Sequence, residues 1–356
     1  MKLIHCADLH LDSPLAVFPP EQARERRAEL LDTFRRMVEF AAQNDVEAIL
    51  IAGDLFDSVK QIRKRTIKAV REIVLQYPQI HFFYLSGNHD EGAGLYSEAE
   101  PAPENFHTFQ KSWTSYRLGE VTVTSALAPK PDTLLLDAGD RNIVLLHGPV
   151  VNAATGRGDE IPLRAYAGKN IDYLALGHYH SFSEYPVDDR AVACYCGCPE
   201  GRGFDECGEK GFLLLETAPQ NKLTRRFVPF AERELHEVPL DMTGCTDQAE
   251  LEKRAEEALA GIPGTDLVLL VSRGEVDPVF APDFHRIDRT LASRFWFARR
   301  KDETSALIRP EDYRNDQSLK GEFIRLVCKE ESLSDTDRDA ILRNGLRALY
   351  REEIDL

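Results

Sequence analysis

Residues able to bind metal ions recur directly after short apolar segments of this 356-residue sequence. Such segments predict buried β-strands, and each of them ends in aspartate, histidine or asparagine. The positions are Asp8, His10, Asp54, Asn88, His89, Asp90, His147, His178 and His180. Open α/β sheets bind their ligands outside the carboxyl ends of their strands. The pattern therefore predicts that these side chains gather into one site.

The types of ligand indicate which metal this site would hold. These histidines, with carboxylates and an amide oxygen, exceed what one tetrahedral zinc ion needs. Mixed nitrogen and oxygen ligation suits Mn, Fe or Zn better than Ca or Mg. Two ions about 3.5–4 Å apart that share a carboxylate activate water and bind a phosphoryl group. The sequence contains no serine nucleophile elbow, phosphate-binding Gly-x-x-x-x-Gly-Lys loop or dinucleotide fingerprint that would suggest other chemistry.

The elements that must position these residues alternate between strand and helix. Buried strands are expected at 2–7, within 49–57, and at 80–85, 142–146 and 171–176, and a strand with alternating side chains is expected at 121–124. Amphipathic helices are expected at 21–44 and 63–76. This order predicts a parallel sheet covered by helices. Residues 91–118 are expected to form a loop, with His107 as an ordinary surface histidine.

Composition points to the cytoplasm. Hydrophobic residues make up 43% of the chain and charged residues 29%, as in ordinary globular proteins, and no apolar segment is long enough to span a membrane. His5 and Asp8 interrupt the first apolar run too early for a secretory signal. Seven cysteines, an odd number, fit a reducing compartment better than a disulfide framework. The net charge of −16 means that any binding of nucleic acid must be local or shared with a partner.

Five motifs, in this order, resemble those of the calcineurin-like metallophosphoesterase family. They are Asp8-x-His10, Gly53-Asp54, Gly87-Asn88-His89-Asp90, His147 and Gly177-His178-x-His180. The resemblance implies a four-layer α/β/β/α sandwich. It also implies two divalent transition-metal ions, for which Mn²⁺ is expected and Fe or Zn are the alternatives.

The same resemblance implies a role for each of these residues. One ion would be held by Asp8, His10, Asp54 and His180. The other would be held by Asp54, Asn88, His147 and His178, with Asp54 as the bridge. His89 matches the family's catalytic histidine, which assists the leaving oxygen or the phosphate, and Asp90 would orient it.

Within that family the chain resembles the SbcD-type DNA repair nuclease subunits, and the YhaO-like branch in particular. The resemblance is carried by segments 8–14, 53–57 and 197–202 and by Glu206, Gly208, Lys210 and Gly211. It implies a metal-dependent DNA phosphodiesterase, exonuclease or endonuclease, that works with an SMC-like ATPase. Some relatives have a histidine where this chain has Asp57, which leaves the preference for double- or single-stranded DNA open. A small-molecule phosphatase or cyclic-nucleotide phosphodiesterase, and a non-catalytic scaffold subunit, are the alternative functions.

Three parts are expected along the chain: a nuclease domain at 1–233, a small α+β capping domain at 234–301 and a helical region at 302–356. The resemblance implies that the cap restricts which DNA shapes reach the metal site, and a plain accessory domain is the alternative. One stretch is locally basic and would either contact phosphates or form a solvated face. Its arginines are Arg286, Arg289, Arg294, Arg299 and Arg300.

The helical region carries two apolar stripes at helical spacing, the second after Ser334 as N-cap. The stripes are Leu319, Phe323, Ile324, Leu326 and Val327, then Ile341, Leu342, Leu346 and Leu349. They would pack against each other or, as the resemblance implies, against the SMC-like ATPase. A homodimer is left open.

Four cysteines lie close together in the sequence, at positions 194, 196, 198 and 207. On the strand expected at 191–196, side chains two residues apart lie about 6.6 Å from each other, which is too far to share a tetrahedral zinc ion. This segment is therefore expected to hold no zinc.

Overall fold

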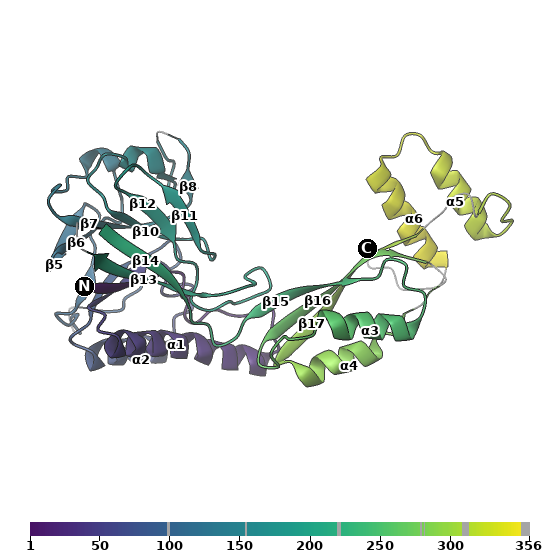
Figure 1. The fold of residues 1–356 in the computed structure, drawn as a ribbon, viewed down its shortest axis with the longest axis horizontal. Coiled ribbons are helices and arrows are strands. Elements are labelled where there is room, and N and C mark those ends of the chain that lie inside the picture. Colours follow the sequence, from purple (N-terminus) through teal and green to yellow (C-terminus); the bar gives the residue numbers. More distant parts are fainter. Residues whose placement is uncertain are drawn as a thin grey trace. The chain divides into compact units, whose positions relative to one another are not determined.

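The computed structural model describes residues 1–97, 100–153, 155–218, 222–277, 280, 282–307 and 313–349. The chain divides into two compact units, Met1–Glu234 and Leu235–Leu356 (Figure 1). Parts of the predicted helical region, residues 308–312 and 350–356, lie outside the described residues.

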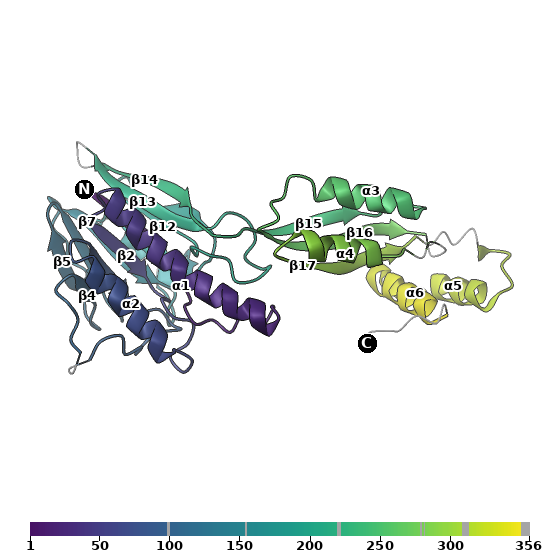
Figure 2. The same cartoon turned by 90° about the horizontal axis from the view of Figure 1, so that it is seen from below.

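The first unit contains a six-stranded sheet in the order β14-β13-β1-β2-β3-β4. Its strands are β1 (Lys2–Cys6), β2 (Ala48–Ala52), β3 (His81–Leu85), β4 (Phe106–Thr108), β13 (Gly211–Ala218) and β14 (Lys222–Pro229). Strands β1 to β4 are parallel, and β13 and β14 are antiparallel to their neighbours. Helices α1 (Pro20–Gln43) and α2 (Lys64–Gln76) connect the parallel strands and lie side by side over the sheet (Figures 1 and 2). The predicted strand and helix order is confirmed here.

A second six-stranded sheet has the order β11-β12-β10-β7-β6-β5. Its strands are β5 (Thr114–Leu118), β6 (Val121–Ser125), β7 (Arg141–His147), β10 (Tyr173–Gly177), β11 (Ser183–Pro186) and β12 (Val192–Tyr195). One apolar core joins the two sheets, with Leu50 and Phe83 from the first and Leu145 and Ala175 from the second. Side chains of both inner faces are thereby removed from water.

Short elements cover the outer face of the second sheet. They are η1 (Pro131–Thr133), η2 (Leu163–Tyr166) and the small pair β8 (Val150–Val151) and β9 (Ile161–Pro162). The buried Tyr166 of η2 packs with Leu174 and Leu176 of β10. The predicted α/β sandwich is therefore confirmed, with 3₁₀ turns in the place of long helices on this side.

The prediction of a loop at 91–118 is partly wrong. It contains β4 and β5, and His107 lies on β4 with its ring 4.7 Å from that of Phe83 and its Nε2 3.0 Å from Nδ1 of His81. His107 is therefore half-buried in an aromatic cluster and is not a surface residue. A three-residue edge strand is too short to show a periodic apolar pattern, because two alternations carry almost no signal.

The second unit begins with a three-stranded parallel sheet in the order β15-β16-β17. Its elements are β15 (Leu235–Asp241), α3 (Gln248–Ala258), β16 (Leu267–Val276), α4 (His285–Arg294) and β17 (Phe297–Ala306). Leu251 of α3 and Leu291 of α4 share one core with Leu240 and Leu270 of the sheet. The expected β-α-β module therefore has a further helix and strand, and β17 crosses the predicted boundary after residue 301.

Helices α5 (Leu319–Lys329) and α6 (Asp335–Leu349) form a pair. The Asp337 N–H donates to Ser334 Oγ at 3.1 Å, so the predicted N-cap is confirmed. Part of each predicted stripe packs between the helices: Ile324, Val327, Leu342 and Leu346 are buried, and Phe323 is partly buried against them. Other residues of the stripes are exposed, namely Leu319, Leu326, Ile341 and Leu349.

A buried ion-pair network fixes α1 to the segment that follows β12. Arg26, fully buried on α1, donates from Nη2 to Glu200 Oε1 at 3.0 Å and to the Gly201 carbonyl at 2.6 Å. Glu200 also accepts from Thr33 Oγ1 at 2.9 Å and from the backbone N–H of Glu232 at 2.8 Å. Removing one partner of such a pair leaves an uncompensated buried charge.

We therefore expect Arg26→Ala to lower the free energy of unfolding by about 3–5 kcal/mol, measured by chemical denaturation. Arg35→Ala is the matched control on the same helix, because Arg35 pairs with Asp32 but is 43% exposed. An exposed pair contributes about 0–1 kcal/mol. Equal losses in the two variants would contradict the role given to the Arg26 network.

Candidate metal centre

The carboxyl ends of strands from both sheets meet at one place and bring the predicted ligands together. Asp8 and His10 follow β1, Asp54 follows β2, and Asn88 and His89 follow β3. His147 ends β7, and His178 and His180 follow β10. The backbone confirms the convergence, because the Asp8 N–H donates to the Gly53 carbonyl at 3.1 Å and the His10 N–H to that of Asp54 at 2.9 Å.

The potential ligand residues form two groups, and within each group the ligand atoms lie within 4.8 Å of one another. The first group is Asp8, His10 and His180, and the second is Asp8, Asp54 and His147. His10 Nε2 and His180 Nε2 are 3.3 Å apart. Asp54 Oδ2 lies 3.3 Å from His147 Nε2 and 3.8 Å from His10 Nε2, so this carboxylate reaches a histidine of each group. Asp8 belongs to both groups, and Asp54 lies between them.

Asn88 and His178 lie at the edge of these groups. Asn88 Oδ1 is 2.9 Å from His147 Nε2. The His178 ring makes an edge contact with the His147 ring at 5.6 Å, and its backbone N–H donates to both Asp8 carboxylate oxygens at 3.0 Å. The His178 ring therefore stands beside the second group, while its backbone orients Asp8.

The backbone of the ligand residues is strained. Asp8, His10 and Asp54 have φ values of 54°, 45° and 52°, and His178 has a φ of 117°. Each such residue costs about 1–3 kcal/mol and persists only where its surroundings fix it. Glycine provides the space for this arrangement, because a Cβ at Gly53 would lie 2.0 Å from His147 Nδ1. The strain is concentrated where the ligands meet.

Proton positions at His147 fit a bound cation. Its Nδ1 donates to the Ala52 carbonyl at 2.9 Å, which leaves Nε2 facing two acceptors, Asp54 Oδ2 and Asn88 Oδ1. A neutral ring would direct a lone pair at both oxygens. Burial alone would lower the pKa of His147, but the hydrogen bond and charge of Asp54 raise it to about 9. A second proton or a metal ion can occupy the position next to Nε2.

The two histidines of the first group, His10 and His180, lead to the same conclusion. His180 Nδ1 donates to Glu206 Oε1 at 2.6 Å, so the His180 Nε2 lone pair points at His10 Nε2. His10 Nδ1 is buried without a hydrogen-bond partner among the described residues. Burial and the charge of Arg202 lower the pKa of His10 to about 2, so this ring stays neutral. Burial raises the pKa of Asp8 to about 6, as expected for a carboxylate that lacks a full counter-charge. The residues present therefore fit metal ions.

Sequence reasoning missed the residues that hold His180 in place. The carboxylate of Glu206, buried beneath the ring, also pairs with Arg202 Nη2 at 2.8 Å. Arg202 Nη1 continues to Asp57 Oδ1 at 2.9 Å. These contacts hold the pKa of Glu206 well below its usual range despite burial. A carboxylate behind a ligating histidine fixes its tautomer and raises its basicity. The one available signal was that Arg202 and Glu206 took part in the family resemblance.

His89 and Asp90 occupy different positions. The His89 backbone N–H donates to Asp54 Oδ1 at 3.0 Å, and its Nδ1 lies 2.8 Å from the Asp57 carbonyl. Asp90 is buried and accepts from Gly87 N at 2.7 Å and Tyr84 Oη at 2.7 Å. The expectation that Asp90 orients the His89 ring is therefore wrong, because the ring donates from Nδ1 to the Asp57 carbonyl and not to Asp90. Asp90 instead fixes the loop on which His89 stands.

The cysteine segment packs into the core. Cys194, Cys196 and Cys198 are buried, and Cys198 Sγ lies 3.6 Å from the His180 carbonyl. Neither ligand group found among the described residues includes a cysteine. The expectation that the segment holds no zinc stays a prediction.

The fold and the site together define a metallophosphoesterase architecture. A sequence profile of the calcineurin-like phosphoesterases matches residues 1–182, half of the chain, and the protein belongs to this family. Members of the family use a dinuclear metal site. No helix in the described part of the chain is long and apolar enough to cross a membrane.

Several known proteins are similar in sequence to most of this chain. The uncharacterized metallophosphoesterase YhaO of Bacillus subtilis is 29% identical over 60% of this chain and 57% of that protein. The DNA double-strand break repair protein Mre11 of Haloferax volcanii is 25% identical over 99% of this chain and 80% of that protein. The D subunit of the nuclease SbcCD of Escherichia coli K12 is 24% identical over 63% of this chain and 66% of that protein. The chain thus spans less than two thirds of YhaO and of the SbcCD protein.

Solved structures include more distant matches. The Pseudomonas putida nuclease MPE is 19% identical, with a TM-score of 0.25 over 39% of this chain and 57% of that one. A dimetal phosphatase from Danio rerio is 10% identical, with a TM-score of 0.39 over 64% and 99%.

The Glu206 carboxylate gives a prediction for metal affinity. Glu206→Gln removes the charge that fixes the His180 tautomer, and we expect the affinity for Mn²⁺ to fall about 10–100-fold by calorimetric titration. Glu209→Gln is the control, because Glu209 is exposed three residues away. Unchanged affinity in Glu206→Gln would show that His180 needs no such support.

Proposed function

We propose that the protein is a metal-dependent phosphodiesterase that cleaves DNA in the manner of SbcD-type nucleases. The observation that carries this proposal is the pair of ligand groups that share Asp8, with Asp54 in reach of a histidine of each group and His89 beside them. The name of the SbcCD relative supports a nuclease, and the name of Mre11, a DNA double-strand break repair protein, supports action on DNA. A small-molecule phosphatase or cyclic-nucleotide phosphodiesterase is the alternative reaction at the same site.

The geometry and the family support the following proposed roles for the ligands. We assign Asp8, His10, Asp54 and His180 to one ion, and Asp54, Asn88, His147 and His178 to the other. Mn²⁺ is our choice of metal, with Fe or Zn as alternatives. When bound, two such ions supply an activated water and a clamp for the phosphoryl group. Glu206 and Ala52 hold His180 and His147 in the tautomers that present Nε2 to an ion.

His89 is the residue we assign to the leaving group. Its side chain is exposed, and the Asp57 carbonyl accepts from Nδ1 and so fixes the ring. Nε2 then has no hydrogen-bond partner among the described residues and is available to a substrate oxygen. In this position a protonated ring can donate to the leaving oxygen or stabilise the charge of the phosphate.

The proposal is tested by incubating the purified protein and Mn²⁺ with labelled duplex DNA, labelled single-stranded DNA and bis(p-nitrophenyl) phosphate. A DNA nuclease degrades at least one of the DNA substrates. Cleavage of the small phosphodiester alone would favour the alternative reaction, and cleavage of none would favour a scaffold subunit.

Asp54→Asn tests the bridge. A neutral amide binds metal ions more weakly than a carboxylate, and Asp54 reaches a histidine of each group. We expect this variant to lose both ions by mass spectrometric metal analysis and to lose activity. Two ions per chain in the variant would rule out the bridging role.

His89→Asn tests the assignment of the leaving-group residue. It removes a proton donor from outside both ligand sets, and we expect turnover to fall about 10²–10⁴-fold with the metal content unchanged. Near-normal turnover, or loss of the metals, would refute this role.

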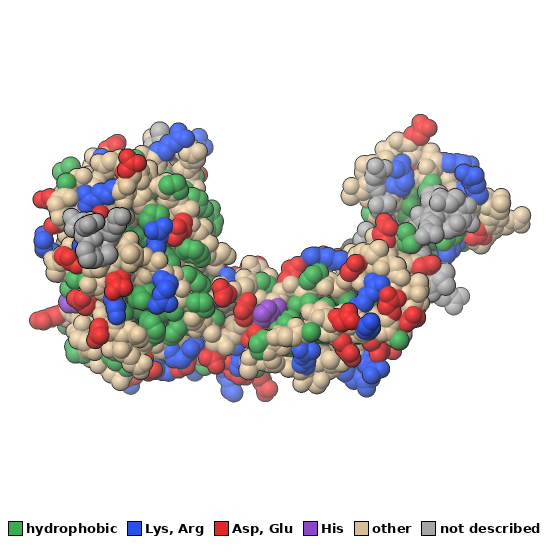
Figure 3. Space-filling view, viewed as in Figure 1, with side chains coloured by type: hydrophobic (Ala, Val, Ile, Leu, Met, Phe, Trp, Pro, Cys, Tyr) green, Lys and Arg blue, Asp and Glu red, His purple; other side chains and the backbone are tan. Residues whose placement is uncertain are grey.

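We further propose that α5 and α6 bind an SMC-like ATPase. Leu319 and Leu326 are 72% and 60% exposed although they belong to the apolar stripe of α5. An amphipathic helix with such residues can lie in a partner's apolar groove. The acidity of this chain fits a complex in which the ATPase supplies basic DNA-binding surface, and acidic and basic side chains are interspersed in the view of Figure 3.

A cytoplasmic location accords with the absence of disulfides among the described residues, which include all seven cysteines.

Deleting residues 313–356 tests this docking role and leaves β17 complete. We expect the truncated protein to cleave bis(p-nitrophenyl) phosphate normally and to lose co-purification with the ATPase. Leu326→Glu is the point variant and should weaken the same association, whereas Glu331→Gln, at an exposed position beyond α5, should not. Retained binding in the truncated protein, or loss of its metals, would contradict the proposal.

A further inference from the structure

A pocket of about 330 Å³ opens next to the metal-ligand segment. One wall is Leu11 and Asp12, which follow His10 directly. Leu11 forms a bridge with Phe56, and its carbonyl accepts from the Asp57 N–H at 3.0 Å. The segments that carry His10 and Asp54 therefore continue into the wall of this pocket.

Four arginines and one carboxylate line the pocket, and we call it the arginine pocket. Arg24 and Arg27 come from the start of α1, and Arg63 and Arg65 from the start of α2. Asp12 is the single acidic residue in the lining, in a protein whose net charge is −16. The charged residues around the pocket are thus mostly basic, in an acidic protein.

The arginines of this pocket are largely uncompensated. The Asp12 carboxylate accepts from the Arg63 backbone N–H at 2.8 Å and lies 3.9 Å from Arg63 Nη1. Arg27 Nη1 donates to the Pro14 carbonyl at 2.8 Å. The side chains of Arg24 and Arg65 make no hydrogen bond or ion pair with any described residue. Burial, and repulsion by the Arg63 guanidinium, lower the pKa of Arg27, which means that these cations repel one another.

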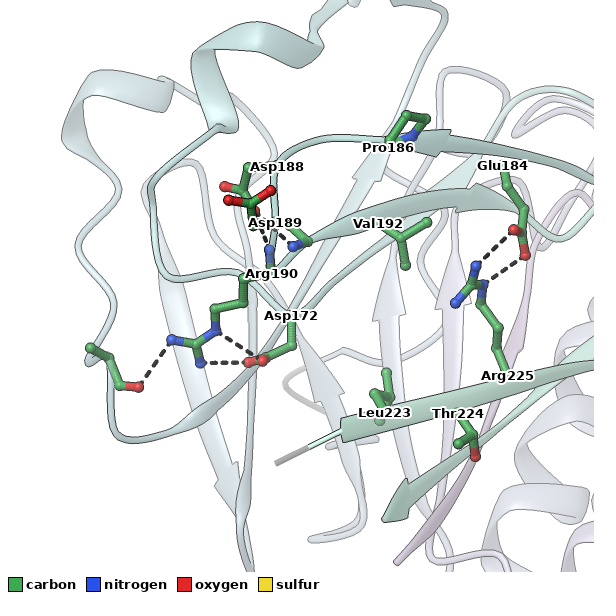
Figure 4. Close-up of a pocket in the computed structure, with 12 residues that line it drawn as sticks. Asp172, Glu184, Pro186, Asp188, Asp189, Arg190, Val192, Leu223, Thr224 and Arg225 are labelled. Carbon is green, nitrogen blue, oxygen red and sulfur yellow. Dashed lines mark hydrogen bonds and ion pairs between the residues drawn. The ribbon is translucent and has the colours of Figure 1, made fainter. Parts of the chain in front are cut away.

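Other clusters of arginines are neutralised by their neighbours. A larger pocket is lined by Arg190 and Arg225 and by four carboxylates (Figure 4). Arg190 pairs with Asp172 at 2.8 Å, and Arg225 pairs with Glu184 at 2.6 Å.

The basic stretch predicted at 286–300 is also partly satisfied internally. Arg286 pairs with Glu252 at 2.7 Å, and Arg300 with Asp288 at 3.3 Å. Arg294 donates to the Leu259 carbonyl at 2.8 Å. The arginine pocket is therefore a stronger candidate for binding an anion than this stretch.

We propose that the arginine pocket binds a backbone phosphate of a nucleic-acid substrate whose scissile phosphate lies at the metal centre. The inference rests on the function proposed above and names the part of the substrate that is held outside that centre. Guanidinium groups match phosphate geometry with two parallel N–H···O bonds. Such contacts position a strand without reading its sequence. A substrate with one phosphate cannot fill both sites, so the pocket contributes only to substrates with several phosphates.

The double variant Arg24→Gln/Arg65→Gln tests the proposal, because both side chains lack partners among the described residues and are exposed. Arg164→Gln/Arg226→Gln is the matched control, which removes the same charge from exposed arginines that do not line the pocket. With Mn²⁺ and a labelled single-stranded 12-mer, we expect KM to rise about tenfold or more in the pocket variant and kcat to change little. Bis(p-nitrophenyl) phosphate should be cleaved as by the unmodified protein.

Binding without cleavage gives a second readout. Fluorescence anisotropy of the same 12-mer in EDTA at increasing salt gives the slope of log K against log[salt], which is negative. The magnitude of this slope decreases by about 0.7 for each phosphate of a single strand that the protein no longer neutralises. We expect the slope to become shallower by about 0.7 in the pocket variant, which loses one phosphate contact, and to stay unchanged in the control.

Each outcome of these measurements has a defined meaning. Unchanged KM and slope in the pocket variant would overturn the proposal and would leave an acidic protein segment as the occupant. Inhibition of cleavage by inorganic phosphate is measured as well. If it differs between the pocket variant and the unmodified protein while the KM for the 12-mer is the same, the proposal is also overturned, because the pocket then binds free phosphate only. Equal losses on the 12-mer and the small phosphodiester would overturn it as well, because the arginines would then support the metal centre. If the unmodified protein cleaves neither substrate, the proposed function fails, and the salt slope still decides whether the pocket binds nucleic acid.

Discussion

The structure depends on a cluster of buried carboxylates and imidazoles for which the protein alone does not provide enough positive charge and hydrogen-bond donors. Asp8 and Asp54 are 1% and 2% exposed, and no arginine or lysine pairs with either of them among the described residues. Burying a carboxylate without a counter-charge is costly. The histidines around them present ring nitrogens to one another and to oxygen acceptors, which only protons or metal ions can reconcile. Divalent cations at this position would supply the missing positive charge and accept the lone pairs of the ring nitrogens. The fold holds the carboxylates and histidines close together without them.

Rigid supports hold that arrangement against strain. Left-handed backbone at Asp8, His10 and Asp54 is fixed by hydrogen bonds between the loops that follow β1 and β2. A Cβ at Gly177 would lie 1.9 Å from the Ala52 carbonyl, so the two sheets approach each other closely beside the site. Behind the ligands, Glu206 and Arg202 connect His180 to Asp57, and the buried network of Arg26 anchors the segment on which Arg202 stands. Positions far apart in the sequence therefore combine to orient a few ring nitrogens.

Strands could be predicted from the sequence where the residues of a single strand form a recognisable pattern. An apolar run that ends in glycine and a ligand identified the strands before Asp54 and His178, because burial and a close approach leave few other residue choices. The supporting residues were harder to find. Glu206 and Arg202 look like ordinary surface charges until the fold places them behind His180. Asp90 stands next to His89 in the sequence, yet its side chain turns away to bind backbone N–H groups. The arginine pocket combines the start of α1 with the start of α2, which local patterns cannot bring together.

The central claim of this account is that the carboxyl edge of the two sheets holds a pair of ions bridged by Asp54. Anomalous X-ray diffraction from crystals grown with Mn²⁺, measured on both sides of the manganese absorption edge, tests that claim without depending on any substrate. The account predicts two anomalous peaks about 3.5–4 Å apart, with the Asp54 carboxylate between them, His10 and His180 beside one and His147 beside the other. A single peak, or peaks that do not contact Asp54, would contradict it.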